Sequence, residues 1–171
     1  MKTLILLRHA KSSWDHTELA DHDRPLGPRG ERASLVMGRY MVQSNLLPDL
    51  ILCSSAQRAM DTCTLVLTQW PQTPPIEYDR DLYLSGERAI RRRIGAVDNA
   101  VERLLVIGHN PDLQNLTVAL AAGVNAPLKR EAREHFPTGS LAIVRFPIDD
   151  WYKVLSTQGT LCELTAPRSL V

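Results

Sequence analysis

Four side chains of this sequence have the types and the placement to handle an anion. Arg8 and His9 directly follow one short apolar run, His109 comes shortly after a second, and Arg58 lies five residues after a third. A guanidinium offers a planar fork of donors to phosphate oxygens, and a neutral imidazole is a competent nucleophile. Gathered at one point, these groups would bind a dianionic tetrahedral group and could accept its phosphoryl group.

The apolar runs predict the strands that would position these groups. Residues 4–7, 50–53 and 104–107 are apolar without polar alternation, which is typical of interior strands in a parallel sheet. Helical patterns separate these runs, and a weaker strand is expected at 76–78. Parallel strands end at the same edge of a sheet, where the ligands of open α/β folds bind. We therefore expect all four side chains to meet at that edge.

Helix signals follow the first two runs. Pro28 suits the first turn of one helix, because its missing amide costs nothing there. Either Ser54 or Ser55 could cap the next helix and would place Arg58 in its first turn. A cation in a first turn opposes the helix dipole, unless it shares an anion with the helix amides. This conflict favours a functional role for the arginine.

The second half of the chain is predicted from turn residues and apolar runs. Asn110 is expected to cap a helix with Pro111 as its first residue. Residues 123–137 are mixed and charged and indicate a loop. A strand at 141–146 is expected to form a hairpin with a second strand at 151–156, whose aromatic and branched residues favour a strand.

The composition indicates one soluble domain over residues 1–171. Hydrophobic residues make up 44% of the chain and the formal net charge is +1, so no overall field recruits nucleic acid or a membrane surface. The first apolar run is too short for a signal peptide or a membrane span. Cys53, Cys63 and Cys162 are odd in number, lie in apolar segments and form no CxxC pair, which favours buried free thiols. We expect a cytoplasmic protein.

Residues 12–29 form a long polar segment directly after the first strand. Such a connection is typical of a binding loop or a lid, although most of its residues are expected to be solvated. His16 and His22 lie among aspartates, but their spacing matches no standard set of metal ligands. We therefore expect no metal site.

Three motifs resemble those of the histidine phosphatase superfamily, the phosphoglycerate-mutase-like enzymes. Residues 7–12, Leu-Arg-His-Ala-Lys-Ser, resemble the family's RHG signature. Residues 54–62, with a serine followed by Arg-Ala and then a threonine, resemble its second motif, and residues 108–111 resemble its third. Together with Arg-Pro-Leu at 24–26 and Arg-Gly at 29–30, the first motif is most similar to the SixA-like phosphohistidine phosphatase branch. The resemblance spans essentially the whole chain.

The resemblance implies a fold and a set of roles. The fold would be a three-layer α/β/α sandwich around a mostly parallel sheet with one antiparallel strand. His9 would be the phosphorylated nucleophile, and Arg8, Arg58 and a protonated His109 would form the phosphate pocket. We also count Ser12, the last residue of the first motif, among the substrate-binding residues. No cofactor is expected.

Two departures from the family's pattern bear on the substrate. Ala10 and Lys11 replace the Gly-Gln or Gly-Glu usual in the mutases. Residues 80–86 carry leucine and tyrosine near the position where mutases and many sugar phosphatases have an acidic proton donor. An alkoxide leaving group needs a proton, whereas an imidazole leaving from phosphohistidine is far less demanding. The nearby carboxylates left open as proton donors are Asp79, Asp81 and Glu87.

We expect a phosphatase with a phosphohistidine enzyme intermediate that acts on phosphohistidine in a protein. The chain is short and lacks the insertions that cover the pocket in larger relatives, which favours an open site suited to a protein substrate. Two alternatives stay open: a broad phosphomonoesterase acting on small phosphorylated molecules, and a non-catalytic phosphate-binding module. Neither nucleic acid nor a membrane is expected as a partner.

Overall fold

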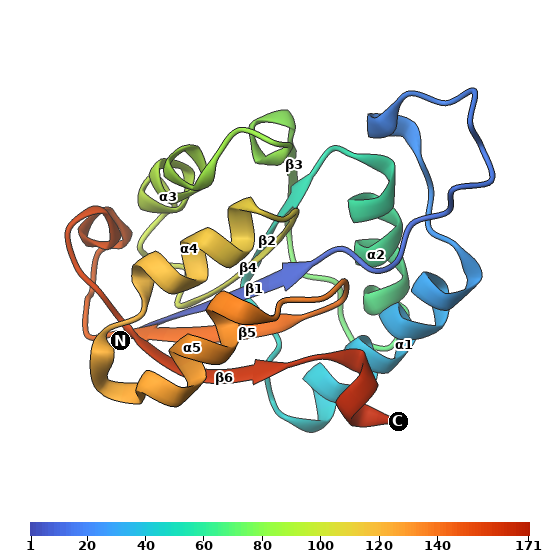
Figure 1. Ribbon diagram of the computed structural model, residues 1–171. Helices are drawn as coiled ribbons and strands as arrows, with labels where there is room; N and C mark the ends of the chain where they lie inside the picture. The colour runs from blue at the N-terminus through green and yellow to red at the C-terminus, as the bar shows by residue number, and fades with distance from the viewer.

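The computed structural model describes residues 1–171, with the side chain of Val124 excepted. Six strands form a single sheet in the order β3-β2-β4-β1-β5-β6 (Figure 1). The strands are β1 Lys2–Arg8, β2 Leu50–Ser54, β3 Ile76–Asp79, β4 Arg103–Gly108, β5 Leu141–Phe146 and β6 Thr160–Thr165. The strands expected at 4–7, 50–53, 76–78, 104–107 and 141–146 are therefore confirmed.

Strand direction matches the expected sheet. β1 pairs with β4, and β2 pairs with both β4 and β3, always in parallel. β5 runs antiparallel to β1 on one side and to β6 on the other. It is thus the one strand of this sheet with reversed direction, and the prediction of a mostly parallel sheet with one antiparallel strand is confirmed.

Helices cover both faces of the sheet and complete the three layers (Figure 1). Two helices pack on one face, and the other three pack on the opposite face. None of the helices in the described part of the chain is long and apolar enough to cross a membrane. The helices are α1 Pro28–Gln43, α2 Gln57–Leu67, α3 Glu87–Gly95, α4 Asp112–Leu120 and α5 Ala126–Glu134.

The first strand shows why its sequence has no polar alternation. Leu4 and Leu6 lie in the core that faces α3 and α4, whereas Ile5 and Leu7 lie in the core that faces α1 and α2. All four side chains are fully buried. A strand with both faces covered must be apolar at every position, because no face reaches water. The strand ends at Arg8, which is the first of the four predicted site residues along the chain.

Cysteine burial was predicted correctly for two of the three residues. Cys53 on β2 and Cys63 on α2 are free and fully buried in the same core. Cys162 is also free, but it lies exposed on β6. The prediction was wrong for Cys162, because side chains alternate along β6 and Leu161 is the one turned into the core, which leaves Cys162 exposed.

The loop expected at 123–137 is mostly helical. A 3₁₀ helix at Gly123–Asn125 leads into α5, which packs on α4 and β6. Ala132 is the buried residue of α5, and Leu128 packs against the core beside it. These two positions are four apart and lie on one face, but they are too few to produce a visible apolar period.

The hairpin expected between 141–146 and 151–156 was wrong in its second strand. Trp151–Leu155 is a 3₁₀ helix, which Asp150 begins by accepting a hydrogen bond from the Tyr152 amide. Trp151 and Val154 are buried and pack into the core, so their apolar character serves packing and not a strand. The strand that follows β5 in the chain and pairs with it is β6, which comes after this turn.

Candidate active site

The structure brings the four predicted site residues together at one edge of the sheet. β2, β4 and β1 are neighbours and run in parallel, so the residues that follow their carboxyl ends converge. The rings of His9 and His109 lie 5.1 Å apart between centroids. Arg58, the second residue of α2, places its Nε 3.4 Å from His9 Nε2. The predicted meeting of strand ends is confirmed.

His9 is held in one tautomer. Its side chain is buried, and Nδ1 lies 2.6 Å from the carbonyl oxygen of Ala10, so this nitrogen carries the proton and donates it. Ala10 is fixed in turn, because its amide donates to Thr62 Oγ1 (3.1 Å). Burial lowers the pKa of His9 to about 4, and Arg58 and Arg8 add to the effect. His9 is therefore neutral at pH 7, with a lone pair on Nε2.

His109 is also neutral in this structure, which differs from the expected protonated form. Its pKa falls to about 3, mainly through burial and then through the neighbouring His9 and Arg58. His109 Nε2 lies 2.7 Å from Ser54 Oγ, which already accepts a hydrogen bond from the Ala56 amide (3.2 Å). If the serine hydroxyl donates to Nε2, the ring proton lies on Nδ1. That buried nitrogen has no partner among the described atoms and is available to a bound anion.

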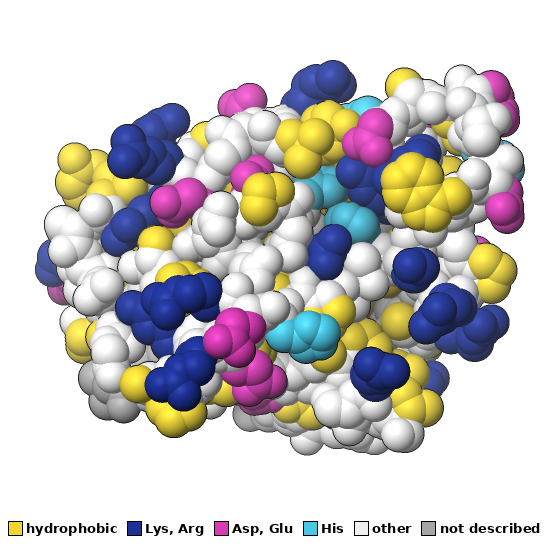
Figure 2. Space-filling view, viewed as in Figure 1, with side chains coloured by type: hydrophobic (Ala, Val, Ile, Leu, Met, Phe, Trp, Pro, Cys, Tyr) yellow, Lys and Arg dark blue, Asp and Glu magenta, His cyan; other side chains and the backbone are white. Residues whose placement is uncertain are grey.

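The two arginines give the pocket an excess of positive charge. Arg8 Nη1 donates to the Phe136 carbonyl (2.9 Å), and its buried Nε has no partner among the described atoms. Burial and the nearby Arg58 lower the pKa of Arg8. Figure 2 shows histidine side chains near the middle of this face with Lys and Arg side chains around them. The guanidinium groups of Arg8 and Arg58 in one pocket favour the binding of an anion between them.

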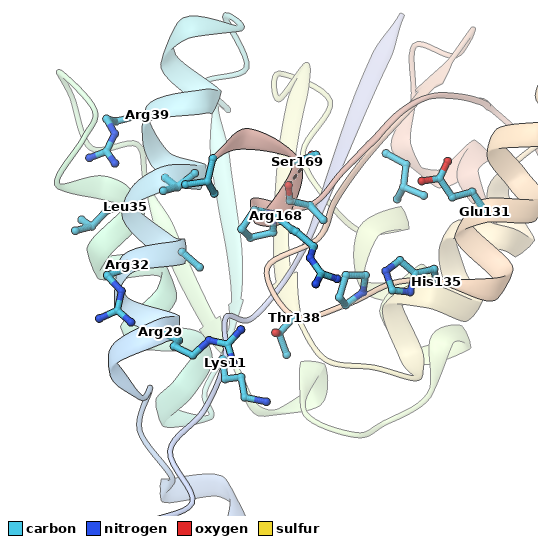
Figure 3. Close-up of a pocket in the computed structure, with 17 residues that line it drawn as sticks. Lys11, Arg29, Arg32, Leu35, Arg39, Glu131, His135, Thr138, Arg168 and Ser169 are labelled. Carbon is cyan, nitrogen blue, oxygen red and sulfur yellow. Dashed lines mark hydrogen bonds between the residues drawn. The ribbon is translucent and has the colours of Figure 1, made fainter.

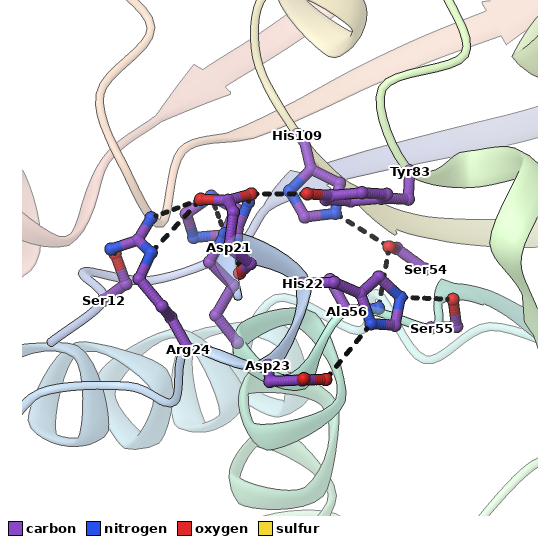
Figure 4. Close-up of polar contacts among 12 residues, drawn as sticks. Ser12, Asp21, His22, Asp23, Arg24, Ser54, Ser55, Ala56, Tyr83 and His109 are labelled. Atoms are coloured by element: carbon purple, nitrogen blue, oxygen red, sulfur yellow. Dashed lines mark hydrogen bonds and ion pairs between the residues drawn. The ribbon is translucent and has the colours of Figure 1, made fainter. Parts of the chain in front are cut away.

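A carboxylate from the polar segment after β1 lies over this pocket. Asp21 begins a 3₁₀ helix, Asp21–Asp23, and its carboxylate pairs with Arg58 Nη2 (3.0 Å) and Arg24 Nη2 (3.1 Å) (Figure 4). The Tyr83 hydroxyl donates to the same carboxylate (2.5 Å). Tyr83 and the two arginines hold the pKa of Asp21 at about 2. The carboxylate thus occupies Arg58 Nη2, while Nη1 donates to the backbone carbonyl of Asp21 (2.7 Å).

Comparison with known proteins gives the family. The sequence profile of the histidine phosphatase superfamily (branch 1) matches residues 4–83. An uncharacterised protein of Mycobacterium tuberculosis is 36% identical over 141 residues, which cover 81% of this chain and 86% of that protein. The chain belongs to the histidine phosphatase superfamily.

Solved structures agree with this family and its SixA-like branch. The SixA protein of Nakamurella multipartitia is 26% identical with a TM-score of 0.85, covering 97% of this chain and 96% of that one. The SixA protein of Agrobacterium tumefaciens is 26% identical with a TM-score of 0.80, covering 97% and 99%. Phosphohistidine phosphatase activity is ascribed to both. This histidine phosphatase therefore belongs to the SixA-like branch.

The remaining residue expected to bind substrate lies beside the pocket of this histidine phosphatase. Ser12 Oγ accepts a hydrogen bond from Arg24 Nη1 (3.0 Å) (Figure 4). Ser12 also forms an isolated antiparallel bridge with Leu26, which closes the base of the segment that carries Asp21. The serine thus holds this segment in place over the phosphatase pocket.

The described side chains do not support a metal site in the polar segment at residues 12–29. His22 contacts the Ser55 hydroxyl at 2.9 Å and lies 3.6 Å from Asp23. Across the described residues, no group of three His, Cys, Asp or Glu side chains is placed to hold a metal ion. In this histidine phosphatase His22 contributes to the packing of the segment, with its ring 4.8 Å from that of Tyr83.

In this histidine phosphatase the side chains of Ser54, Ser55 and Asn110 form hydrogen bonds around the site and cap no helix. The residue before α2 is Ala56, whose amide is bonded to Ser54, and no side chain caps the helix. α4 begins at Asp112, so Pro111 precedes it instead of being its first residue. The side-chain Nδ2 of Asn110 donates to the Phe136 carbonyl (3.0 Å), which also accepts a hydrogen bond from Arg8. The cap predictions were wrong because the two serines contact histidines and Asn110 binds the Phe136 carbonyl.

The carboxylate over the pocket was not among the expected proton donors. Asp79 pairs with Arg93 (3.1 Å) and accepts a hydrogen bond from the backbone amide of Asp81, whose own side chain is exposed. No described hydrogen bond or ion pair joins Asp79, Asp81 or Glu87 to the four site residues. Tyr83 lies where the acid was expected, with its ring 5.3 Å from that of His109. Asp21 had no sequence signal beyond its place in a predicted binding loop or lid.

Proposed function

We propose that this protein hydrolyses phosphohistidine in a protein substrate. The observation that supports this choice is the position of Asp21, the carboxylate at the pocket, which is paired with Arg58 and Arg24 and accepts a hydrogen bond from Tyr83. Such a carboxylate holds no proton at neutral pH and cannot assist an alkoxide leaving group. An imidazole has an ordinary pKa near 6.5 and leaves with far less assistance. The pocket therefore suits cleavage of a phosphorus–nitrogen bond.

The first step transfers the phosphoryl group to the enzyme. His9 Nε2 attacks phosphorus in line with the substrate imidazole, because its other nitrogen is bound to the Ala10 carbonyl. The new bond joins Nε2 to phosphorus, and the bond to the substrate nitrogen breaks with its electron pair. Arg8, Arg58 and His109 Nδ1 bind the oxygens of the transferring group. The substrate ring carries a proton on its other nitrogen, so it leaves as a neutral imidazole and takes no proton from the enzyme.

The second step restores the enzyme. Water attacks phosphorus in line with His9 Nε2, and the bond between them breaks. The electron pair returns to Nε2, and the proton lost by water leaves with orthophosphate. Each step needs Arg58 on the phosphoryl oxygens, so Asp21 must give up its bond to Arg58 when substrate binds. One anion replaces another, which limits the cost of opening the pocket.

The SixA proteins that share 26% identity with this chain support the proposal, since phosphohistidine phosphatase activity is ascribed to them. The test compares leaving groups. A phosphohistidine peptide and glycerol phosphate are offered to the enzyme, and kcat/KM is measured for each. We expect the peptide to be preferred by roughly a hundredfold, as expected when one substrate lacks general acid help. Equal or faster hydrolysis of glycerol phosphate would contradict the proposal.

Variants identify the nucleophile. We expect His9→Ala to abolish turnover and His16→Ala, an exposed histidine in the polar segment, to retain it. Brief reaction with a radioactive phosphoramidate followed by denaturation should leave an acid-labile, alkali-stable label. Peptide mapping should place this label on His9. A label on another histidine, or full activity of His9→Ala, would remove His9 from the mechanism.

A further inference from the structure

A groove with a volume of about 1030 Å³ lies beside the catalytic pocket. α1 lies on one side of the groove, with Arg29 extending towards Arg168, and with Arg32 and Arg39 on the other side of the helix (Figure 3). The 3₁₀ helix Pro167–Leu170 and residues 135–138 lie opposite α1. Lys11, two residues after the nucleophile, lies at the lower end of the view in Figure 3. Lys11 and Arg29 belong to the sequence that resembles the first motif, but the proposed reaction gives neither of them a role.

The groove is strongly cationic. One carboxylate side chain, Glu131, lies among its described lining residues. The whole chain has a formal net charge of only +1, so this concentration of positive charge is local. All the lysine and arginine side chains of the groove are exposed, and no ion pair of the described chain includes them. These cations are Lys11, Arg29, Arg32, Arg39 and Arg168.

The groove shares a wall with the catalytic pocket. In the segment 135–138, His135, Pro137 and Thr138 line the groove, while the Phe136 carbonyl binds Arg8. The amide of Gly139 then donates to the carbonyls of Arg8 (3.1 Å) and His9 (3.0 Å). A chain lying in the groove would therefore pass within a few residues' length of the nucleophile.

The groove also has an apolar floor, which narrows the class of ligand. None of its described lining residues is Phe, Tyr or Trp, so stacking of nucleic-acid bases would depend on His135 and the arginines alone. Arg29 and Arg39 are ten positions apart on α1, a rise of about 15 Å. That length fits about ten residues of a helix. The apolar lining residues include Ala33, Val36, Pro137, Leu164 and Pro167.

We propose that this groove binds an acidic, amphipathic segment of the phosphoprotein whose phosphohistidine enters the catalytic pocket. The inference rests on the proposed function for the identity of the partner and on the groove itself for the chemistry of the ligand. Carboxylates of the segment pair with the cations of the rim, and its apolar side chains cover the floor. The groove thus selects a protein substrate that the catalytic pocket alone cannot distinguish.

A fluorescent peptide of twelve residues with glutamate and leucine at helical spacing tests the groove directly. Figure 3 shows Arg29 and Arg168 near each other in the groove, so the test variant is Arg29→Gln/Arg168→Gln. The matched control is Arg88→Gln/Arg92→Gln, which removes two exposed arginines from α3 on the other side of the sheet. Fluorescence anisotropy at low salt should show Kd raised roughly tenfold in the groove variant, with the control unchanged.

Three binding results would overturn the proposal. The wild-type protein could fail to bind the peptide, both double variants could weaken it equally, or neither could weaken it. A decathymidylate strand is measured in parallel as a probe for nucleic acid. Tighter binding of this strand than of the peptide, lost in Arg29→Gln/Arg168→Gln, would also overturn the proposal because it would make the groove a nucleic-acid site.

Turnover separates this inference from the proposed function. The same variants are assayed with free phosphohistidine and with a phosphohistidine protein that carries an acidic helix. The groove variant should raise KM for the protein roughly tenfold and leave free phosphohistidine unchanged. Hydrolysis of both substrates with unaltered KM would overturn the groove and leave the phosphatase intact. Peptide binding without any hydrolysis of phosphohistidine would support the acidic ligand and contradict the proposed function.

Discussion

The nucleophilic role that we propose for His9 is supported by neighbours that are themselves fixed. The Ala10 carbonyl selects the tautomer, Thr62 fixes Ala10, and burial keeps the ring neutral. The imidazole therefore presents Nε2 to the pocket before any substrate arrives. Preorganisation of this kind lowers the barrier because no proton or ring has to be rearranged during the reaction.

Asp21→Asn should increase the affinity of the pocket for orthophosphate. The carboxylate competes for Arg58, and an uncharged amide competes less. We expect the inhibition constant of orthophosphate to fall roughly tenfold, which corresponds to about 1.4 kcal/mol. The measurement is competitive inhibition of phosphohistidine hydrolysis at constant ionic strength.

Asp23→Asn is the matched control, because Asp23 lies in the same 3₁₀ helix and pairs with His22 instead of with the site. It should leave the inhibition constant unchanged. Weaker phosphate binding by Asp21→Asn would show that the carboxylate orients Arg58 for the anion and does not compete with it.

At the scale of elements, the sequence predicted best where burial on both faces dictates composition. The runs in β1, β2 and β4 could be assigned because a strand between two helical layers has no polar positions. α5 could not be assigned, since Ala132 and Leu128 are its only apolar contacts with the core. Trp151 and Val154 were taken for a strand because aromatic and branched residues occur in any buried segment.

The site likewise contains residues whose position could be predicted from the sequence and one whose position could not. Arg8 ends β1, and His9 and His109 directly follow strand ends, so the topology determines where they lie. Asp21 reaches the pocket through contacts with Arg58 and with a tyrosine 62 residues away in the chain. Such a position depends on tertiary packing and leaves no local pattern in the sequence.

Gly30→Ala tests how α1 supports the residues after the nucleophile. A Cβ at Gly30 would collide with the backbone carbonyl of Lys11, and backbone cannot move aside cheaply. We expect the free energy of unfolding to fall by roughly 1–3 kcal/mol, as for other overpacked sites, and kcat/KM for phosphohistidine to fall with it. Urea denaturation and the hydrolysis assay provide the two measurements.

Gly123→Ala serves as the comparison, because no described atom lies within 4 Å of a Cβ added at that residue. Its free energy of unfolding should stay within about 0.5 kcal/mol of the wild-type value. Equal stability of the two variants would show that α1 can shift away from Lys11 without loss.

For the whole molecule, the two buried histidines should couple stability to pH. His9 and His109 have pKa values of about 4 and 3 when folded, below the 6.5 expected when unfolded. Between these values the unfolded chain binds more protons, so the free energy of unfolding rises with pH. Acidification from pH 7 to pH 4 should therefore destabilise the protein, by on the order of 3 kcal/mol through His9 alone.

Urea denaturation at pH 7, 5.5 and 4.5 measures this slope. Replacement of both histidines by asparagine should flatten it, whereas His16→Ala should not. Asp21 does not interfere, because its stabilising contribution is lost only below about pH 4 as the pH falls towards its folded pKa. An equal slope in all three proteins would assign the pH dependence to other groups.

The order of the strands has a consequence for how the chain is made. β1 is the first strand synthesised, yet both strands that pair with it, β4 and β5, lie between Arg103 and Phe146. At ordinary translation rates its apolar residues wait on the order of 10 s for a partner. During synthesis this strand is an unpaired hydrophobic edge of the kind that chaperones cover and that aggregates recruit. The strand that leads to the proposed nucleophile is thus a part of the nascent chain that needs protection.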